Sequence, residues 1–572
     1  MFAATRIRRG ALLGALTGAI FFVADVSGAL LAIGSLFDPK PASVVLVLIA
    51  GAVEIGVALT AGALLGALWT RRIALSVTPP VPLALVVFAV IVASGGYAIR
   101  RGRALPDPPP RPAVRAVRPV SVLWIVIDTL RADTLYGDAI DFPLTPELRR
   151  FADRALVFTD AESAAGWTIP SVATLLSGIH PTALYSARRF LPGWAPTAAE
   201  RLHAAGYETR ALVDNAIIER RNGFAQGFET FDQRSGFRFA FSLPGFRLLP
   251  SSVRELLREA LPAAYQGSPG VTDAALEIIA RAREAPLFLY IHYMDPHHPY
   301  YAHPSQGPEP ADAESAAMHF LVQRLRNDST DRPSAAQMRY IRHRYAGEIR
   351  ALDDDLGRLL RAWDDTISAD SFVLVTADHG EEFLDHGELG HGQSMYRELV
   401  HVPLIVRLPE SQPGAFAPGT RLTTPVGQVD LVPTLLDIVG VAPQIGADGI
   451  LPQGTSWLPW LDGKAPPPAQ PIYGTSSHYG RRIYRWREGS WSRLITFDKR
   501  TGGGVKHELF DIDDDPREQS NRYDPSSPRV RAMSSRFEPF LDAQETARDP
   551  KPTDVAEFTE DHDALRALGY VQ

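Results

Sequence analysis

Three long apolar segments lie within the first hundred residues, at positions 11–37, 42–69 and 73–99. Each is long enough to cross a bilayer, which takes about 20 residues of helix, and none shows a polar face. A cleaved signal peptide has a single short apolar region, so it does not account for three segments. The pattern therefore predicts a membrane domain over residues 1–104 that contains three transmembrane helices.

The pattern changes after a stretch rich in proline and arginine at residues 105–120, which we interpret as an extended linker. Short apolar runs, typical of parallel strands buried on both faces, follow at 121–127, 286–292, 371–376 and 402–406. Helical periodicity occurs between these runs, at 196–205, 272–283 and 340–363. Strands that alternate with helices predict a doubly wound α/β sheet over residues 121–465, with its site at the carboxyl ends of the strands.

A second break in the pattern falls at the proline-rich residues 466–471. Beyond it, apolar and polar residues alternate with a period of two, as they do in antiparallel strands. We expect a small C-terminal antiparallel subdomain at residues 466–530, followed by a tail at 531–572.

Composition narrows the class of protein. The chain has 572 residues and a formal net charge of -7, so it lacks the basic surface that binding to nucleic acid requires. It contains no cysteine, which excludes disulfides, thiolate metal ligands and a cysteine nucleophile.

Acidic residues and histidines follow three of the predicted strands. Asp128 follows the first, Asp295 and His297 follow the second, and Asp378 and His379 follow the third. One acidic residue at a strand end is often a helix cap, but three such ends meet at one edge of a parallel sheet. We therefore expect these side chains to form one site.

The segment GWTIPSVATLLSG, from Gly166, predicts a helix that has Pro170 in its first turn and ends at Gly178. Thr168 then lies just ahead of the helix N-terminus, where free N–H groups and the helix dipole favour an anion such as phosphate or sulfate. A threonine in this position can also simply cap the helix. Both interpretations are open from this segment alone.

Eight segments, in order along the chain, resemble motifs of the sulfatase family of the alkaline phosphatase superfamily. They are VIDTLRADTLYGD from Val126, GWTIPSVATLLSG, AGYETRALVDN followed by GFAQGFETFD, LYIHYMDPHHPY, YAGEIRALDDDLGRLL, VTADHGEEFLDHGELGHGQSMYRELVHVPLIV, VDLVPTLLDIVG and HELFDIDDDPREQSN. The resemblance covers roughly residues 120–525. It implies an alkaline-phosphatase-like, doubly wound mixed sheet and an enzyme that acts on sulfate or phosphate esters.

The resemblance also implies the roles of particular residues. Asp128, Asp378 and His379 occupy the positions of ligands to one divalent metal ion. Carboxylate oxygens with one imidazole suit calcium, magnesium or manganese. Thr168 occupies the position of the nucleophile.

His391 and His297 occupy positions at which family members place basic groups near the substrate. An imidazole can donate a proton to a leaving group near neutral pH, so we assign both histidines to catalysis. His298, His386 and His401 could be neighbours of the site, but an ordinary surface position is the simpler interpretation for each.

The chain departs from the family at the nucleophile. Sulfatases carry a formylglycine made from Cys or Ser in a Cys/Ser-x-Pro-x-Arg motif, whereas this chain has Thr168 and, at the arginine position, Val172. Asp214 and Asn215 stand near the position of a family Lys-x-His pair, and Thr129 replaces a second metal-binding aspartate. With no aldehyde precursor and less positive charge, phosphoester or phosphodiester chemistry is favoured over sulfate-ester hydrolysis.

These features predict a membrane-anchored, metal-dependent hydrolase whose substrate is a sulfated or phosphorylated glycan or lipid. One alternative is a phosphoglycerol- or phosphoethanolamine-type transferase that modifies a cell-envelope glycan or lipid. Another is a non-catalytic descendant that binds an anion. By resemblance to membrane-anchored transferases of the superfamily, we expect a multi-pass protein of the cell membrane with an extracytoplasmic catalytic domain.

Overall fold

A computed structural model of the protein describes residues 119–137, 142–184, 191–234, 267–281, 283–298, 300, 333–412, 414–443, 451–478, 480–498 and 504–546. The predicted membrane domain at 1–104 lies outside these residues, as does the linker up to residue 118. Of the tail predicted at 531–572, residues 531–546 are described and belong to a helix, and the rest lies outside. Among the residues described, no helix is long and apolar enough to span a bilayer.

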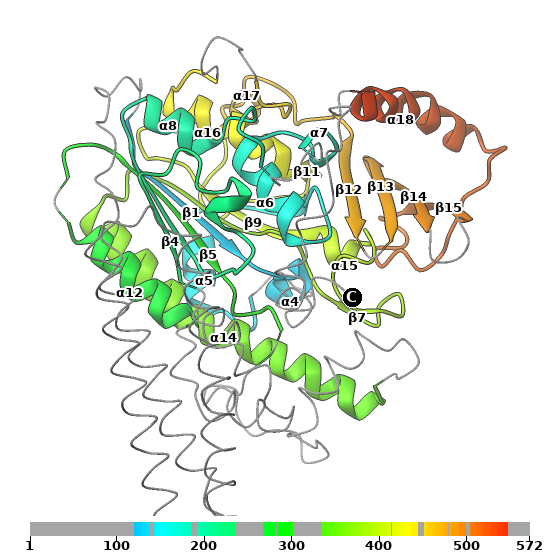
Figure 1. Ribbon diagram of the computed structural model, residues 1–572, viewed down its shortest axis with the longest axis horizontal. Helices are drawn as coiled ribbons and strands as arrows, with labels where there is room; N and C mark the ends of the chain where they lie inside the picture. Colours follow the sequence, from blue (N-terminus) through cyan, green and yellow to red (C-terminus); the bar gives the residue numbers. More distant parts are fainter. Residues whose placement is uncertain are drawn as a thin grey trace, which may run out of the picture. The chain divides into compact units, whose positions relative to one another are not determined.

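A nine-stranded mixed sheet forms the core of the described chain (Figure 1). Its order is β10, β2, β9, β6, β1, β5, β3 and β4, with β11 paired to β2. The strands are β1 (Val122–Ile127), β2 (Leu156–Glu162), β3 (Glu208–Val213), β4 (Thr230–Gln233), β5 (Leu287–Tyr293), β6 (Phe372–Ala377), β9 (His401–Arg407), β10 (Arg421–Leu422) and β11 (Val426–Gly427).

Strand β1 lies between β5 and β6 and is parallel to both. Every residue of β1 is fully buried, which explains why the sequence shows a continuous apolar run here. Strand β9 pairs antiparallel with both β6 and β2, so the sheet is mixed. The four strands expected from the sequence correspond to β1, β5, β6 and β9, and the doubly wound fold is confirmed.

Helices cover both faces of this sheet (Figure 1). On one face, α14 (Ala335–Thr366) packs against α5 (Pro146–Ala152) and α12 (Gly267–Ile279). On the other lie α6 (Thr168–Ser177), α8 (Ala198–Ala204), α16 (Leu431–Val439) and α17 (Leu458–Leu461). The helices expected at 196–205, 272–283 and 340–363 correspond to α8, α12 and α14.

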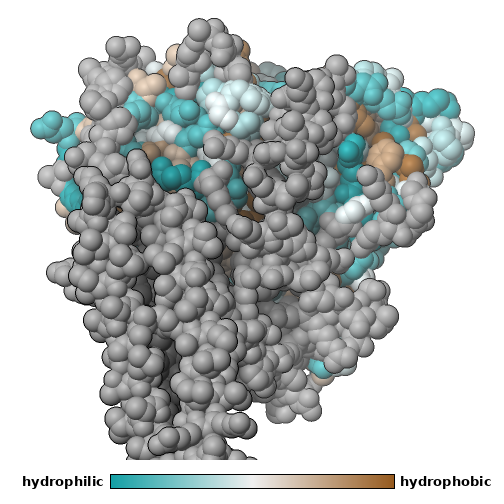
Figure 2. All heavy atoms as spheres, in the orientation of Figure 1, coloured by the Kyte–Doolittle hydropathy of each residue, from teal (hydrophilic) through white to brown (hydrophobic). Residues whose placement is uncertain are grey.

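A four-stranded antiparallel sheet confirms the predicted C-terminal subdomain. Its strands are β12 (Ile472–His478), β13 (Arg481–Glu488), β14 (Trp491–Asp498) and β15 (Gly504–Asp511). Helix α18 (Pro528–Thr546) packs on it through Met533 and Phe537, which form an apolar cluster with Tyr473 and Trp486. On the face drawn in Figure 2, apolar atoms show among polar ones over this sheet.

The other short elements are α4 (Ala132–Tyr136), α7 (Pro181–Leu184), α15 (Arg397–Val400), the paired strands β7 (Glu382–Phe383) and β8 (Leu389–Gly390), and the 3-10 helices η1 (Arg220–Asn222) and η4 (Gln428–Asp430). Elements β7, β8 and α15 lie between β6 and β9 in the chain. They form the segment that carries His391.

Candidate active site at the carboxyl ends of the central strands

Two acidic side chains come from neighbouring strand ends. Asp128 follows β1 and Asp378 follows β6, and these strands are parallel partners, so both residues leave the sheet at the same edge. Both are fully buried, and each offers an oxygen within 4.8 Å of the other's. Two buried like charges at this separation are unfavourable unless a proton or a cation neutralises one of them.

One carboxylate oxygen of Asp128 accepts hydrogen bonds, whereas the other has no hydrogen-bond partner among the described residues. Its Oδ2 accepts hydrogen bonds from Asn215 Nδ2 (2.6 Å) and His292 Nε2 (3.2 Å). Its Oδ1 is buried and has no hydrogen-bond partner among the described residues. A buried carboxylate oxygen in this state costs free energy unless a donor or a metal ion contacts it.

Asp378 has the same arrangement. Its Oδ1 accepts the backbone N–H of His379 (2.8 Å) and that of Thr129 (3.3 Å), whereas Oδ2 has no hydrogen-bond partner in the part of the chain described. Thr129 has a φ of 54°, a conformation that β-branched residues rarely adopt. The surrounding structure therefore holds a strained backbone at this contact, as is common at functional sites.

The imidazole of His379 turns its Nε2 atom toward both of these carboxylates. Nδ1 donates to the Gly380 carbonyl (2.8 Å), so Nε2 is the ring nitrogen that can offer a lone pair to a cation. Nε2 lies 3.7 Å from Asp128 Oδ1 and 3.5 Å from Asp378 Oδ2. It also lies 3.2 Å from the hydroxyl oxygen of Thr168. Four atoms that can contact a cation therefore meet at one buried point.

This set of donor atoms fits a divalent cation. Carboxylate oxygens with an imidazole nitrogen are ligands that calcium, magnesium or manganese accept. The two buried oxygens that have no hydrogen-bond partner are the atoms that such a cation would contact. Asp128, Asp378 and His379 would hold it.

His292 is a second imidazole close to both carboxylates. The carboxylate of Asp128 can only accept, so Nε2 of His292 carries the hydrogen in their 3.2 Å contact. Nδ1 then accepts from the Tyr290 hydroxyl (3.2 Å), and burial raises the pKa of Tyr290 well above its ordinary value. With both ring nitrogens engaged, His292 orients Asp128 and is a poorer metal ligand than His379.

The pKa values of the two carboxyl groups move in opposite directions. Burial, together with the charge of Asp128, raises the pKa of Asp378 to about 6. Burial also opposes the charge on Asp128, but the hydrogen bond from His292 and the charges of His297 and His379 hold its pKa below the ordinary value. Asp128 is thus the more acidic member of the pair.

Helix α6 brings Thr168 to this point. Trp167 is the N-cap residue in an extended conformation, and the helix ends at Gly178, whose φ is 71°. The sequence placed Thr168 just ahead of the helix, but it is the first helical residue, because the turn begins one residue earlier than Pro170 suggested. Its hydroxyl contacts His379, so Thr168 is not the residue that caps the helix.

Two serines tie the start of α6 to the strand end that carries Asp378. The hydroxyl groups of Ser163 and Ser171 both contact the Asp378 carbonyl oxygen and lie 2.9 Å from each other. All of these groups are buried. Hydrogen bonds on either side of Thr168 in the chain therefore fix its position relative to Asp378.

Three further histidine rings border the cluster. The ring centroid of His391 lies 4.5 Å from that of His379 and 4.9 Å from that of His297. His298 stacks on His297 at 4.3 Å. His391 Nδ1 contacts Glu381 Oε1 at 2.9 Å. All four histidines are buried, so a surface position for His298 is wrong.

The structure brings together the six residues singled out from the sequence, which are Asp128, Thr168, His297, Asp378, His379 and His391. His386 and His401 have structural contacts instead. His386 Nδ1 bonds with Glu398 (2.7 Å), and His401 Nε2 bonds with the Thr159 carbonyl (2.8 Å).

Sequence reasoning assigned no role to the side chains that hold these groups in place, namely Ser163, Ser171, Asn215, His292, Tyr300 and Glu381. The sequence does contain a signal for His292, because a histidine within an apolar strand needs a buried polar partner. It contains a signal for Asn215 as well, because this residue follows the carboxyl end of β3. It contains no signal for the two serines, since their partner is a backbone carbonyl far away in the chain.

Comparison with protein families gives two matches. A family model described as Sulfatase matches residues 121–441. A second, described as N-sulphoglucosamine sulphohydrolase, C-terminal, matches residues 387–542. The first match includes the central sheet and every residue of the site.

Several curated proteins are similar to this chain. Choline-sulfatase of Rhizobium meliloti is 23% identical over 443 residues, which cover 70% of this chain and 82% of that protein. Iduronate 2-sulfatase of Homo sapiens is 24% identical over 514 residues, or 78% of this chain and 82% of that protein. Arylsulfatase K of Xenopus laevis is 27% identical over 217 residues, and this match spans 36% of this chain and only 38% of that protein.

Solved structures share the fold. One is a protein in complex with its substrate D-glucosamine-2-N,6-O-disulfate, with a TM-score of 0.57, 19% identity, and coverage of 76% of this chain and 100% of that chain. Another is a phosphonate monoester hydrolase from Silicibacter pomeroyi, with a TM-score of 0.56, 20% identity, and coverage of 75% and 96%. At these identities the likeness concerns the fold alone.

Proposed function

The chain belongs to the sulfatase family of the alkaline phosphatase superfamily, and from that premise we propose a metal-dependent phosphoester or phosphodiester hydrolase with Thr168 as its nucleophile. Membership of the family makes the chain an enzyme that acts on ester bonds. The observation that carries the finer proposal is that three metal-competent atoms meet beside the Thr168 hydroxyl.

Asp128, Asp378 and His379 would hold the cation, which supplies Lewis-acid chemistry by lowering the pKa of a nearby hydroxyl and stabilising charge on the transferred group. Thr168 stands at the first position of α6, where free backbone N–H groups and the helix dipole favour the oxygens of an anionic group. The nucleophile and the anion site therefore coincide.

The reaction proceeds in two steps. After the Thr168 hydroxyl has lost its proton to solvent, its oxygen bonds to phosphorus while the bond to the alcohol breaks. His391, in its cationic form, gives the proton on Nε2 to the departing oxygen and becomes neutral. The oxygen of a water molecule then bonds to phosphorus while the bond to the Thr168 oxygen breaks, and the water gives a proton to His391. The Thr168 oxygen takes back a proton from solvent, which restores both residues. His297, whose ring borders that of His391, contacts a substrate oxygen.

Three features favour phosphate over sulfate esters. A hydroxyl nucleophile that forms a phosphothreonine needs no aldehyde, and the chain has no cysteine from which to make one. Val172, at the position of the family arginine, is apolar and fully buried. Asp214 is buried as well, and burial together with the charge of Asp295 raises its pKa well above the ordinary value. At and near the positions where the family has an arginine and a lysine, the described residues therefore offer a sulfate group an apolar side chain and a carboxyl group.

The substrate in this proposal is a phosphorylated glycan or lipid of the cell envelope. We place the protein in the cell membrane, with its site on the extracytoplasmic side, because the sequence contains three apolar segments of membrane-spanning length. If an acceptor hydroxyl replaces water in the second step, the same site acts as a transferase.

The test compares purified wild type with Thr168→Ala and Thr168→Ser on 4-nitrophenyl phosphate, bis(4-nitrophenyl) phosphate and 4-nitrophenyl sulfate. We expect the wild type to hydrolyse at least one of the phosphate esters, and we expect a chelator to abolish this activity. Thr168→Ala should lower kcat by about 10³-fold or more, whereas Thr168→Ser should retain part of the activity because it keeps the hydroxyl. Mass spectrometry of quenched wild type should find phosphate on Thr168. Sulfatase activity that survives Thr168→Ala would sink this mechanism.

Measuring the metal content of the purified protein distinguishes the proposed hydrolase from a non-catalytic descendant of the family. A hydrolase of this kind should bind one divalent ion per chain. A protein that binds no stoichiometric ion and hydrolyses none of the three esters would instead be a non-catalytic, anion-binding descendant of the family.

A further inference from the structure

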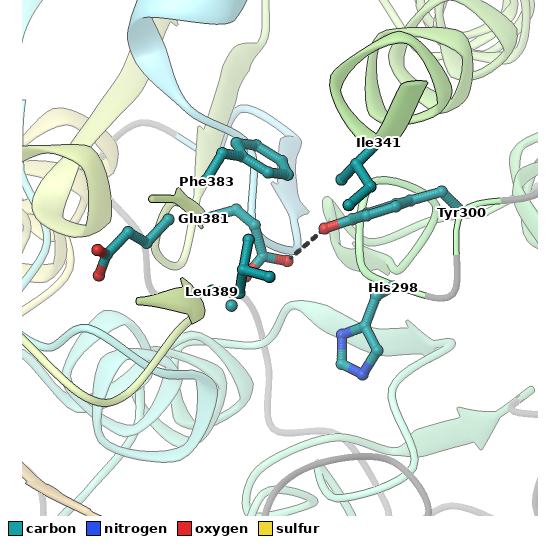
Figure 3. A pocket seen from close by; sticks show the side chains of 8 residues that line it. His298, Tyr300, Ile341, Glu381, Phe383 and Leu389 are labelled. Atoms are coloured by element: carbon teal, nitrogen blue, oxygen red, sulfur yellow. Dashed lines mark hydrogen bonds between the residues drawn. The ribbon is translucent and has the colours of Figure 1, made fainter. Parts of the chain in front are cut away.

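Glu381 connects two segments of the site. Its Oε1 accepts a hydrogen bond from His391 Nδ1 (2.9 Å), and its Oε2 accepts one from the Tyr300 hydroxyl (2.9 Å). Figure 3 shows the Tyr300 hydroxyl pointing at the carboxylate. Tyr300 belongs to the segment after β5, whereas His391 follows β8. Each carboxylate oxygen therefore has its own donor.

The surroundings of Glu381 exclude bulk water. Glu381 is 1% exposed and His391 is 2% exposed. Beside them, Tyr300, Ile341 and Phe383 line a cavity of only about 10 Å³, which is room for about one water molecule (Figure 3). A hydrogen bond between ionisable groups is stronger in such a place than in water, and its loss costs more.

The backbone at Glu381 is anchored as well. Arg131 donates from one guanidinium nitrogen to the Glu381 carbonyl oxygen (2.9 Å) and to Asp385 (2.8 Å). Gly380, just before it, fits against α15, because a Cβ added at Gly380 would lie 2.0 Å from the carbonyl oxygen of Glu398. The carboxylate of Glu381 therefore projects from a fixed segment.

We infer that Glu381 is a positioning residue for His391: it holds the imidazole in one orientation, in which Nδ1 keeps its hydrogen and Nε2 is the nitrogen that exchanges a proton in the reaction. A carboxylate can only accept, so the hydrogen in their contact belongs to Nδ1, and Nε2 is left on the opposite side of the ring. The inference rests on the proposed function, in which His391 protonates the departing alcohol. Tyr300 fixes the carboxylate from its other oxygen.

The experiment uses two esters that share the transferred group and differ in the alcohol. The 4-nitrophenyl ester has a leaving group that needs little protonation, whereas the phenyl ester depends on the acid. The 4-nitrophenyl ester and the phenyl ester are each prepared with two transferred groups, phosphate and methyl phosphate. Kinetics are then measured with the transferred group whose esters the wild type hydrolyses. The variants are Glu381→Ala, Glu381→Gln, His391→Ala and the double variant Glu381→Ala/His391→Ala.

We expect Glu381→Ala to lower kcat/KM by about 10–100-fold for the phenyl ester and by less than about 3-fold for the 4-nitrophenyl ester. Glu381→Gln should fall between wild type and Glu381→Ala, because the amide oxygen can still accept from Nδ1. The double variant should be no slower than His391→Ala, since Glu381 acts only through His391.

Glu382→Gln is the matched control. Glu382 follows Glu381 directly, but its oxygens accept from the backbone of His386 and Glu388 and from Gln393. Any loss of activity in this variant should be equal for the two esters, as a purely structural effect would be.

An equal loss on both esters in Glu381→Ala, or a double variant much slower than His391→Ala, overturns the role of Glu381. Neither result contradicts the proposed function, in which Thr168 is the nucleophile. That function fails separately, if Thr168→Ala remains as active as wild type on the same esters.

Discussion

At the scale of single residues, two carboxylate oxygens of this site have no hydrogen-bond partner in the part of the chain that the structure describes. Asp128 Oδ1 and Asp378 Oδ2 are both buried, and every other oxygen of these two side chains accepts a hydrogen bond. A cation that contacts both oxygens removes the repulsion between the carboxylates and satisfies their lone pairs. The metal should therefore contribute to stability as well as to the reaction.

We expect Asp378→Asn to abolish binding of the divalent ion and yet to raise the melting temperature of the chelator-treated protein. The amide removes one of two buried like charges, while its carbonyl oxygen can still accept from the N–H groups of Thr129 and His379. Wild type should be stabilised by about 2.7 kcal/mol when the free ion is at 100 times its Kd. Thermal unfolding in chelator and in calcium, magnesium or manganese measures both effects.

Asp437→Asn is the control for this substitution, because Asp437 is an exposed aspartate on α16. Its melting temperature should follow that of wild type in every buffer. Retention of one divalent ion per chain by Asp378→Asn would contradict the assigned ligands.

The positions of the candidate ligands and nucleophile were predictable from the sequence because each stands at the end of a strongly patterned element, whereas the roles proposed for them come from the family resemblance. Asp128 and Asp378 follow apolar strands, and Thr168 begins a helix marked by Pro170 and Gly178. The role of Glu381 was not predictable. Its partners His391 and Tyr300 depend on how two irregular segments fold back over the strand ends, which periodicity does not encode.

At the scale of elements, the segment between β6 and β9 is held by hydrogen bonds from several directions. His386, in the turn between β7 and β8, donates from Nδ1 to Glu398 (2.7 Å) and from Nε2 to the Glu518 carbonyl (2.9 Å). An imidazole that donates from both nitrogens is cationic. Burial lowers the pKa of His386, but its hydrogen bonds and the charge of Glu398 outweigh burial and raise the pKa to about 9.

The contribution of His386 to stability should depend on pH. Because its folded pKa of about 9 exceeds the unfolded value of 6.5, the contribution is complete below pH 6.5 and is lost as the pH rises through about 9. We expect His386→Gln to lower the free energy of unfolding by about 1–2 kcal/mol at pH 6.5, allowing for solvent screening, and by much less at pH 9.5. Urea unfolding at both pH values measures the difference.

His401→Gln provides the comparison. Burial lowers the pKa of His401 to about 4, so this histidine is neutral at both pH values. Its substitution should therefore have the same effect at pH 6.5 and at pH 9.5. A similar pH-independent effect for His386→Gln would show that the cationic pair with Glu398 does not stabilise the segment.

Four strands of the central sheet were predictable from the sequence, but their directions were not. The apolar runs at β1, β5, β6 and β9 are alike in composition, because all four strands are buried, yet β9 runs antiparallel to β6. Hydrophobic periodicity carries no information on direction. The two-residue strands β7, β8, β10 and β11 are too short to leave any pattern.

At the scale of the whole described chain, a buried ionic network joins the C-terminal sheet to the central sheet. Arg485 of β13 makes two hydrogen bonds to Glu162 of β2 (2.9 Å each) and one to Glu518 (2.7 Å). Arg487 also bonds with Glu162 (2.8 Å). Burial opposes the charge of Glu162, but these two arginines hold its pKa at about 2. Hydrophobic patterning does not indicate this network, since Glu162 and Arg485 lie 323 residues apart.

Because the network is buried, removing one of its cations should cost more than the loss of a surface ion pair. We expect Arg485→Met to lower the free energy of unfolding by about 3–5 kcal/mol, since Glu162 and Glu518 lose their main partner inside the protein. The double variant Glu162→Gln/Arg485→Met should recover part of this loss, because it removes one uncompensated charge. Arg482→Met, on the same strand at an exposed position, is the matched control. Midpoints of urea unfolding compare the variants, and equal midpoints for Arg485→Met and Arg482→Met would show that the network does not hold the two sheets together.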